Sequence, residues 1–306
     1  MSTHVAVAIV GYDNLHDVVR CIDALATSTY DDFEIVICEN GGKRAYEALC
    51  ATLSTNLPRG QRITLVEALA NRGYANGINV CIAASQTADA WWLLNPDTEV
   101  SPGAMAALVA RLELGDVHAV GGTLYFANGR VQSFGGIWRG WLARAVSIGN
   151  GSVLGAVPDV KEVERKLTYL SGASMLVGRA FVERTGPMSE DFFLYCEEVD
   201  WCLRAADCGL KLGFSFDAQV LHRQGTTTGS STVLKTRSWL SVYLDERNKM
   251  LITKGHFPAR LPIAATAALS LIAMRYLRKG AFRQFGYGVS GWLAGLRGER
   301  GAPPSA

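Results

Sequence analysis

The sequence predicts an α/β fold in which a mostly parallel sheet is sandwiched by helices. Two observations support this: near-continuous apolar runs of strand length recur through the first hundred residues, and helix-like segments separate them. Strands that are apolar on both faces belong to parallel sheets covered by helices on both sides. With 306 residues, of which 49% are hydrophobic, the chain can bury a large core around such a sheet.

Strand and helix signals alternate in the first third of the chain and then loosen. Residues 125–165 carry many glycines without clear periodicity, so we expect a long loop there, and long loops in compact domains are usually functional. A helix over 239–254 is expected to end at Gly255, because Pro258 follows. The other expected elements are strands at 5–10, 34–38, 62–66, 90–94, 169–177 and 212–220, and helices at 15–25, 75–84, 104–114 and 197–207.

Charge divides the chain into an acidic body and a basic tail. From Lys235 onward there are 12 Lys and Arg against three Asp and Glu, whereas residues 1–234 carry 18 against 25. The apolar stretch 261–274 within this tail favours an anionic membrane surface over nucleic acid as a partner. Its 14 residues fall short of the roughly 20 that span a bilayer. A core helix with solvated flanks is an equal alternative.

The cysteines indicate the compartment. There are seven of them, without a Cys-x-x-Cys pair, and the amino terminus lacks the basic and apolar regions of a signal peptide. We therefore expect buried thiols in a reducing cytoplasm.

The segment Trp91-Trp-Leu-Leu-Asn-Pro-Asp-Thr-Glu-Val100 makes a strand tip acidic. Proline has no amide hydrogen to give to a sheet, so the strand must stop at Pro96 and leave Asp97 and Glu99 in the following loop. Open α/β sheets bind their ligands beyond the carboxyl ends of the strands. Two carboxylates there suit Mg2+ or Mn2+, which complete their shells with substrate phosphates. A plain polar turn is the alternative.

Two further strand ends carry polar groups. Glu39, after the second strand, can accept hydrogen bonds from a base or a ribose, or lie in solvent as a turn carboxylate. The run Asn71-Arg-Gly-Tyr-Ala-Asn-Gly-Ile-Asn79 combines flexible glycines with the amino end of a helix, which suits a phosphate or a base. It lacks Gly-x-Gly-x-x-Gly, and this argues against a nicotinamide dehydrogenase.

The run Phe192-Phe-Leu-Tyr-Cys-Glu-Glu-Val-Asp200 crowds carboxylates beside aromatic residues. Repulsion and partial burial among Glu197, Glu198 and Asp200 should raise a pKa and prepare a general base, although an acidic helix start would look the same. Trp201 can offer an apolar face to a sugar. His222 closes a later strand, where it is either structural or a third ligand beside Asp97 and Glu99.

These motifs in this order resemble the glycosyltransferase family 2 pattern, most closely its rhamnosyltransferase-like members. The resemblance runs from Val5 to about His222, more weakly to Asn248, and also includes Leu-Ser-Gly-Ala at 170–173. It implies an inverting enzyme with a GT-A catalytic domain over 1–234. In that domain 1–100 form the nucleotide half and 101–234 the acceptor half, and a helical extension follows at 235–306.

The resemblance also implies roles for individual residues. Glu198 takes the place of the catalytic base. Asp97, Glu99 and His222 take the place of the metal ligands. The expected nucleotide contacts are Glu39, Asn71, Arg72, Gly73 and Asp97, and the expected acceptor or sugar contacts are Gly172, Glu197, Asp200 and Trp201.

Donor and acceptor are expected from the same resemblance. dTDP-rhamnose comes first as the donor, with UDP-hexoses or galactofuranose behind it, and the acceptor is a glycan or a lipid-linked saccharide at the inner membrane face. Glu39-Asn-Gly-Gly42 departs from the usual Asp-Asn-x-Ser, which bears on base and sugar preference. The rivals are a non-catalytic glycan-binding protein of this fold and a metal-dependent nucleotide-sugar hydrolase. Assembly as a homo-oligomer is left open.

Overall fold

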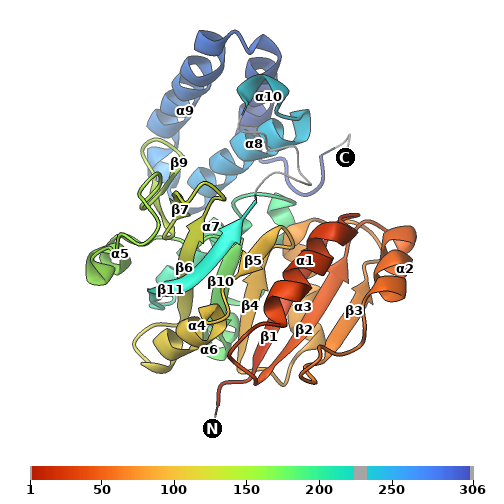
Figure 1. Ribbon diagram of the computed structural model, residues 1–306. Helices are drawn as coiled ribbons and strands as arrows, with labels where there is room; N and C mark the ends of the chain where they lie inside the picture. Colours follow the sequence, from red (N-terminus) through yellow and green to blue (C-terminus); the bar gives the residue numbers. More distant parts are fainter. Residues whose placement is uncertain (1, 224–232, 304–306) are drawn as a thin grey trace.

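The structure is a computed structural model that describes residues 2–223 and 233–303. A large mixed sheet with helices on both faces forms its body, and three long helices stand at one end (Figure 1). The strand order is β3-β2-β1-β4-β10-β6-β11-β5, with β7 paired to β6. This confirms the predicted fold class.

The first half of the sheet is parallel, as the apolar runs predicted. Its strands β1, β2, β3 and β4 pair in parallel, so their carboxyl ends meet at one edge. All seven residues of β1 are buried because helices cover both of its faces. The elements are β1 (Val5–Gly11), α1 (Leu15–Leu25), β2 (Phe33–Glu39), α2 (Lys43–Thr52), β3 (Ile63–Glu67), α3 (Tyr74–Ala84) and β4 (Ala90–Leu94).

The second half adds strands of both directions. β10 runs antiparallel between β4 and β6, whereas β11 is parallel to β6 and ends antiparallel to the short β5. The elements are β5 (Thr98–Val100), α4 (Ala104–Glu113), β6 (Ala119–Tyr125), β10 (Ser174–Gly178), α6 (Arg179–Thr185), η1 (Glu190–Phe192), α7 (Glu197–Asp207) and β11 (Leu212–His222).

Two buried clusters follow the alternation of the central strands. Val5, Val7 and Ile9 of β1 face the cluster that includes α1, α2 and α4. Ala6 and Ala8 face the cluster that includes α3, α6 and α7. The core therefore sits on both sides of the sheet and leaves the strand ends free for a site. All seven cysteines are free thiols.

The expectation of a structureless loop over 125–165 was wrong. The segment forms β7 (Val131–Ser133), the hairpin β8 (Gly136–Arg139) with β9 (Arg144–Ser147), and α5 (Val160–Lys166). Strands of three or four residues are too short for an alternating pattern to be visible, and tertiary pairing decides them. The strand expected from residue 169 begins only at Ser174, because the chain first turns, with the Ser174 amide donating to the Ser171 carbonyl.

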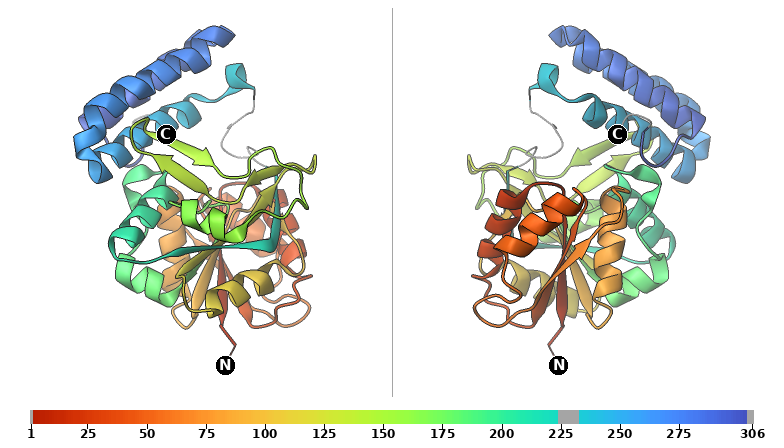
Figure 2. Two further views of the ribbon diagram at one scale, coloured as in Figure 1. Left: turned by 90° about the vertical axis from the view of Figure 1, so that its left-hand side faces the viewer. Right: turned by 90° about the vertical axis from the view of Figure 1, so that its right-hand side faces the viewer.

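Three helices make up the carboxyl-terminal part. They are α8 (Trp239–His256), α9 (Leu261–Tyr276) and α10 (Phe282–Arg297), with the short turns η2 (Leu234–Thr236), η3 (Pro258–Arg260) and η4 (Leu277–Lys279). Figures 1 and 2 place them beyond the carboxyl edge of the parallel strands, far from the amino terminus. One stretch, Pro258–Lys279, is long and apolar enough to cross a membrane, by length and composition alone.

Glycines let α10 approach α8 closely. A Cβ on Gly291 would lie 2.1 Å from the Tyr243 carbonyl oxygen, and one on Gly295 would lie 2.3 Å from the Arg247 carbonyl oxygen. Backbone cannot yield as a flexible side chain can, so these positions exclude any larger residue. The helix pair therefore depends on a strip of glycine.

We expect Gly291→Ala to lower the melting temperature, because the new methyl group would push α10 away from α8. The matched control is Gly286→Ala in the same helix, where nothing lies within 4 Å. There alanine should stabilise by up to about 1 kcal/mol through helix propensity. Thermal unfolding of both variants checks this, and equal melting temperatures would contradict the packing described.

Candidate active site

The carboxyl edge of the sheet brings together two segments that are far apart in the sequence. β4 ends at Leu94, the chain turns through Pro96, and β5 then pairs with the last residues of β11. In that register His222 lies opposite Thr98. Asp97 and His222 are thus held at one point by sheet pairing, although 124 residues lie between them.

Asp97 and His222 form a close pair at this point. The His222 Nε2 atom lies 3.3 Å from Asp97 Oδ1, and its Nδ1 atom lies 2.9 Å from Gln132 Oε1. With Nδ1–H donating to that oxygen, Nε2 of the neutral ring is an acceptor that faces a carboxylate. Two acceptors at this distance require a proton or a cation between them. Gln132 of β7 carried no sequence signal, since it lies in the segment expected to be a loop.

Glu99 has a different partner. Its Oε1 atom receives Arg223 Nη2 at 2.6 Å and Arg223 Nε at 2.7 Å. In β5 it lies opposite Leu221, and neighbouring strand residues point to opposite faces. Among the described residues, no group of three or more His, Cys, Asp and Glu side chains is placed to hold a metal ion. The structure thus brings together two of the three expected ligands and pairs the third with an arginine.

The loops after β1 and β2 are joined by Glu39. This carboxylate is 1% exposed, and its Oε1 atom accepts the amide hydrogens of Asp13 at 2.9 Å and Gly41 at 2.7 Å. Burial raises its pKa despite these two hydrogen bonds. Glu39 therefore holds the loop after β1 and the loop after β2 together at the carboxyl edge of the sheet.

The other expected nucleotide residues follow β3. Asn71 accepts the amide hydrogen of Gly73 at 2.9 Å, and Arg72 pairs with Glu190 at 2.8 Å. Gly73 has φ 92°, and a Cβ there would lie 2.0 Å from the Phe193 carbonyl oxygen. The glycine is thus required by contact with residues 192–196. The amino end of α3 then faces this turn, where the Tyr74 amide donates to the Phe193 carbonyl at 2.9 Å.

The turn over residues 192–196 precedes the predicted base and is strained. Phe193, Tyr195 and Cys196 have φ of 63°, 72° and 71°, in the left-handed region that non-glycine residues avoid at about 1–2 kcal/mol each. Cys196 is also the cap of α7. Such backbone persists only where the surroundings determine it, and it clusters at functional sites.

Glu198 and Glu197 begin α7 in contrasting surroundings. Burial raises the pKa of Glu198 to about 7, against the opposing effect of backbone amides at the helix start. Glu197 is turned into the core at 4% exposure, and burial together with Glu198 raises its pKa well above the usual range. Glu198 alone of the two keeps partial access to solvent, so it is the one that can exchange a proton near neutral pH.

Gly172 lies against Glu198. A Cβ at this glycine would be 3.6 Å from the Glu198 Cβ and 3.8 Å from its carboxyl carbon. The Gly172 carbonyl accepts the Tyr74 hydroxyl at 2.9 Å. Tyr74, the first residue of α3, and Gly172, just before β10, therefore meet beside the Glu198 carboxylate. The role of Gly172 as an acceptor or sugar contact stays a prediction. Tyr74 was not foreseen in this place.

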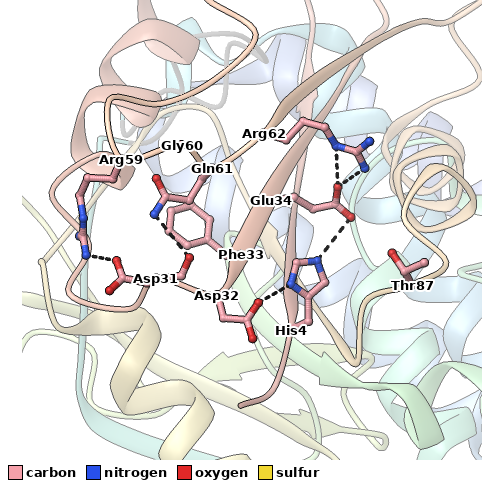
Figure 3. A pocket seen from close by; sticks show the side chains of 10 residues that line it. All are labelled: His4, Asp31, Asp32, Phe33, Glu34, Arg59, Gly60, Gln61, Arg62 and Thr87. Atoms are coloured by element: carbon pink, nitrogen blue, oxygen red, sulfur yellow. Dashed lines mark hydrogen bonds and ion pairs between the residues drawn. The ribbon is translucent and has the colours of Figure 1, made fainter. Parts of the chain in front are cut away.

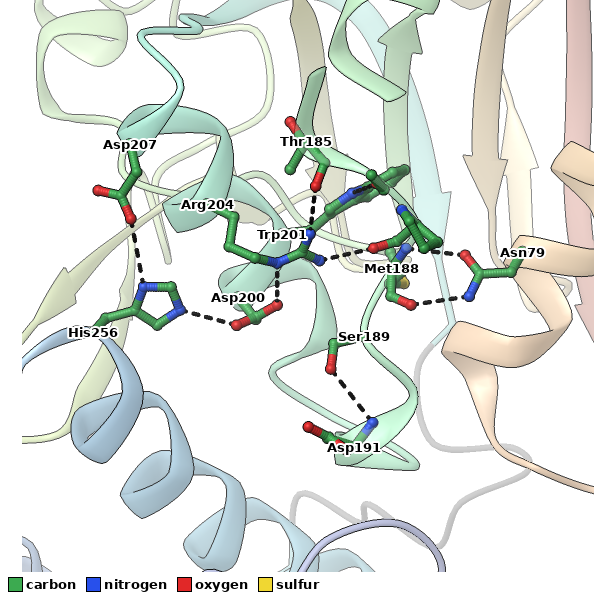
Figure 4. A network of polar contacts seen from close by, with 12 residues as sticks. Asn79, Thr185, Met188, Ser189, Asp191, Asp200, Trp201, Arg204, Asp207 and His256 are labelled. Atoms are coloured by element: carbon green, nitrogen blue, oxygen red, sulfur yellow. Dashed lines mark hydrogen bonds and ion pairs between the residues drawn. The ribbon is translucent and has the colours of Figure 1, made fainter. Parts of the chain in front are cut away.

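Asp200 and Trp201 have structural partners (Figure 4). Asp200 receives Arg204 Nε at 2.8 Å and lies 2.9 Å from His256 Nε2. Trp201 is fully buried, donates to the Gly186 carbonyl at 2.8 Å and packs edge-on against Phe181 at 5.0 Å. The expected contact of Trp201 with a sugar was wrong in this structure, because the ring has no exposed face.

A separate depression of about 680 Å³ lies at the other end of the sheet (Figure 3). It is lined by charges at the amino ends of β1 and β2, including His4, Asp32 and Glu34. These pair among themselves: His4 Nδ1 lies 2.7 Å from Asp32 Oδ1, and Glu34 receives Arg62 Nε at 3.2 Å. The strand-end site, and not this depression, holds the groups suited to catalysis.

Known proteins resemble this chain in sequence. The chain is 23% identical over 251 residues to a low-salt glycan biosynthesis hexosyltransferase of Haloferax volcanii, covering 79% of this chain and 78% of that protein. It is 25% identical over 237 residues to the N-acetylglucosaminyl-diphospho-decaprenol L-rhamnosyltransferase of Mycobacterium tuberculosis, covering 69% of this chain and 73% of that protein.

Solved structures share the fold at low identity. A mannosyltransferase of Pyrobaculum calidifontis, in complex with GDP-Man and Mn2+, aligns at a TM-score of 0.57 and 16% identity, over 97% of this chain and 88% of that one. GalNAc-T7 with UDP, GalNAc and Mn2+ aligns at 0.59 and 16%, over 81% of this chain and 51% of that one. Both are GT-A glycosyltransferases, and the shared fold is the GT-A fold.

The family model described as Glycosyl transferase family 2 matches residues 6–170, which is more than half of the chain. With the GT-A fold and the strand-end site on one sheet, the chain belongs to glycosyl transferase family 2 and is a glycosyltransferase.

Proposed function

We propose that this glycosyltransferase is inverting and metal-dependent, with Glu198 as the base and Asp97 and His222 as the anchors of the cation. The observation that carries the proposal is the pair of unlike acidic sites at the carboxyl edge. One is a partly exposed carboxyl group whose pKa is raised to about 7 by burial. The other is a carboxylate that faces an imidazole nitrogen.

The residues present fit a divalent cation. A carboxylate and an imidazole nitrogen at a strand end supply two ligands, which leaves room for diphosphate oxygens and water. The nitrogen ligand favours Mn2+ over the harder Mg2+. When bound, the cation would neutralise the charge of the leaving diphosphate. Glu99 stays a candidate third ligand that would first have to leave Arg223.

The chain's own part in the reaction is proton transfer and positioning. With a pKa of about 7, Glu198 is ionised in a large fraction of molecules at neutral pH and still basic enough to take a proton. The acceptor oxygen forms a bond to the anomeric carbon, the bond from that carbon to the diphosphate breaks, and the hydroxyl proton passes to Glu198. Attack opposite the leaving group inverts the anomeric centre.

For the donor we propose dTDP-rhamnose, with a UDP-hexose or UDP-galactofuranose as the alternative. The name of the mycobacterial relative supports rhamnose, and that of the haloarchaeal relative supports only a hexose. For the acceptor we propose a lipid-linked saccharide, again by analogy with the decaprenol-linked substrate in the mycobacterial name.

A lipid-linked acceptor would require work at the cytoplasmic face of the membrane, and the tip of the α9–α10 hairpin suits this. Phe282 is 71% exposed and Leu277 40% exposed, and both lie among the exposed bases Arg278, Lys279 and Arg283. No Asp or Glu occurs from residue 247 to 298, where nine Lys and Arg do. Apolar side chains ringed by positive charge match an anionic bilayer surface. A second copy of the same surface would be repelled.

We expect Glu198→Gln to lower the transfer rate by about 10²–10⁴-fold, since an amide cannot take the proton. Donor affinity should persist, because the proposed anchors of the diphosphate are Asp97 and His222. Asp207→Asn is the matched control, on the same helix and exposed. Turnover with a panel of saccharide acceptors measures this; full activity of Glu198→Gln would place the base elsewhere. Donor consumption at full rate without acceptor would instead identify a hydrolase.

Asp97→Asn should weaken the Mn2+-dependent part of nucleoside diphosphate binding by at least tenfold, because an amide is a poorer ligand than a carboxylate. Calorimetry with dTDP, UDP and GDP, in the presence of Mn2+, Mg2+ or neither, measures this affinity. The same measurements rank the three nucleotides by affinity. Glu99→Gln tests whether Glu99 is a third ligand. If affinity is unchanged, the cation is held by Asp97 and His222 without Glu99. Binding that is indifferent to the ion in the wild-type protein would refute the metal proposal.

Sedimentation with lipid vesicles tests the membrane surface. The wild-type chain should bind vesicles containing phosphatidylglycerol, more weakly at high salt, and bind phosphatidylcholine vesicles poorly. Phe282→Ser combined with Lys279→Glu should reduce binding about tenfold or more, given roughly 1 kcal/mol per basic residue near the surface. The control is Arg44→Glu at an exposed position of α2, which should leave vesicle binding unchanged. Equal binding by all three proteins would exclude this surface.

A further inference from the structure

The carbonyl groups of the 192–196 turn all need partners, because its left-handed residues break the regular bonding of the chain. Three of them, the carbonyls of Phe192, Leu194 and Tyr195, find a partner on a single side chain. Asn248 Nδ2 of α8 lies 3.0 Å from the carbonyl oxygen of Phe192 and 2.8 Å from that of each of Leu194 and Tyr195. Asn248 has no exposed surface, so no water can replace it.

Arg247 holds the amide of Asn248 in this orientation. Its Nε atom donates to Asn248 Oδ1 at 2.9 Å, which leaves the amide hydrogens for the turn. Its Nη2 atom donates to the Phe192 carbonyl at 2.8 Å, and its Nη1 atom to the Gly301 carbonyl at 2.8 Å. With 1% exposure, Arg247 is as fixed as its neighbour.

The turn passes this constraint to the start of α7. Cys196 caps the helix, and its carbonyl accepts the Asp200 amide at 2.9 Å. The backbone amides of Glu198, Val199 and Cys196 point toward the Glu198 carboxylate and act on it. A change in the backbone at Cys196 therefore moves the groups that surround the proposed base.

We propose that Asn248 is a positioning residue for transfer: from α8 it holds the strained turn that aims the Glu198 carboxylate. The proposal rests on the proposed role of Glu198 as base. It assigns to the carboxyl-terminal helices a part in the chemistry besides any contact with a membrane. Asn248 touches no reacting atom and acts only through the turn.

Loss of the hydrogen bonds from Asn248 to the turn should change the pKa of Glu198 in a defined direction. Burial is the largest cause of its raised pKa, and Asp245 of α8 raises it further, whereas the amides lower it. If the turn opens and water enters, the dominant effect weakens and the pKa falls toward its ordinary value. The other ionisable groups that face Glu198 are Glu197, Cys196 and Cys202 of α7, Tyr74 of α3 and Tyr169.

The test is the pH dependence of kcat in Asn248→Ala. In the wild-type protein a base with a pKa near 7 gives a rate that falls about tenfold per pH unit below that value. In the variant we expect kcat to drop on the order of 10²-fold, as for a misplaced catalytic group, and the acid limb to move to lower pH. Affinity for the nucleoside diphosphate with Mn2+, measured by calorimetry, should stay within about twofold.

Two variants serve as controls. Thr253→Val removes a buried hydroxyl from the same helix, where it donates to the Lys249 carbonyl, and should leave kcat and the acid limb unchanged. Asn248→Ser keeps one donor and should recover part of kcat. It also reports on the site if the alanine variant is poorly folded.

The proposal would be overturned if the acid limb of the kcat profile of Asn248→Ala stayed where it is in the wild-type protein. It would also be overturned if nucleotide affinity fell in parallel with kcat. Either result would indicate a general structural role for Asn248. Failure of the proposed function looks different. In that case Glu198→Gln itself would remain active, whatever Asn248→Ala does.

Discussion

The structure depends on one constraint: the backbone carbonyls of residues 192–196 need hydrogen-bond partners from the elements that pack against this turn. Helix α3 supplies the Tyr74 amide, and α8 supplies Asn248 and Arg247. Left-handed backbone at three non-glycine residues costs a few kcal/mol in total. It is tolerated because an unmade buried hydrogen bond would cost as much for each carbonyl. Sheet, loop and carboxyl-terminal helices therefore meet at the turn that carries the proposed base.

The carboxyl groups of the site are chemically alike, but their surroundings give them different pKa values and different partners. Glu197 is turned inward, where burial raises its pKa well above the usual range, whereas the pKa of Glu198 is raised only to about 7 and its side chain keeps access to solvent. Asp97 faces His222, and Glu99 is held by Arg223. The sequence placed several carboxyl groups at strand or helix ends, among them Glu39, Asp97, Glu99, Glu197 and Glu198, and the family resemblance implied different roles for them. Burial and the nearest partner separate them.

The carboxyl-terminal helices connect two properties of the enzyme. Their glycine strip lets α10 pack closely on α8, which fixes α8 over the turn. Their far end exposes Phe282 and Leu277 among basic residues. The surface proposed to meet lipid and the helix proposed to aim the base are therefore parts of one group of packed helices. Such an arrangement suits a reaction whose acceptor is anchored in a membrane while its donor is soluble.

The sequence by itself determined the alternation of strands and helices, the stop at Pro96 and the acidic ends of the strands. These follow from local rules: apolar strands need cover on both faces, and proline cannot stay in a sheet. The match of motifs to a glycosyltransferase family followed from residue order alone. Asp97, Glu198 and His222 were singled out because each lies at a strand or helix end, where ligands bind in this class of fold. Gly172 came from the family resemblance alone, and the roles of all four stay predictions.

Only the tertiary structure decided the rest, because it depends on partners that are distant in the chain. Gln132 reaches His222 through a strand too short to show a pattern, and Arg223 takes Glu99 through the β5–β11 register. Trp201 is buried by Phe181, and no local rule shows which face of an amphipathic helix its ring will join. Asn248 satisfies carbonyls more than 50 residues away. Contacts of this kind depend on how distant segments pack in the folded protein, so the spacing of residues in the sequence does not predict them.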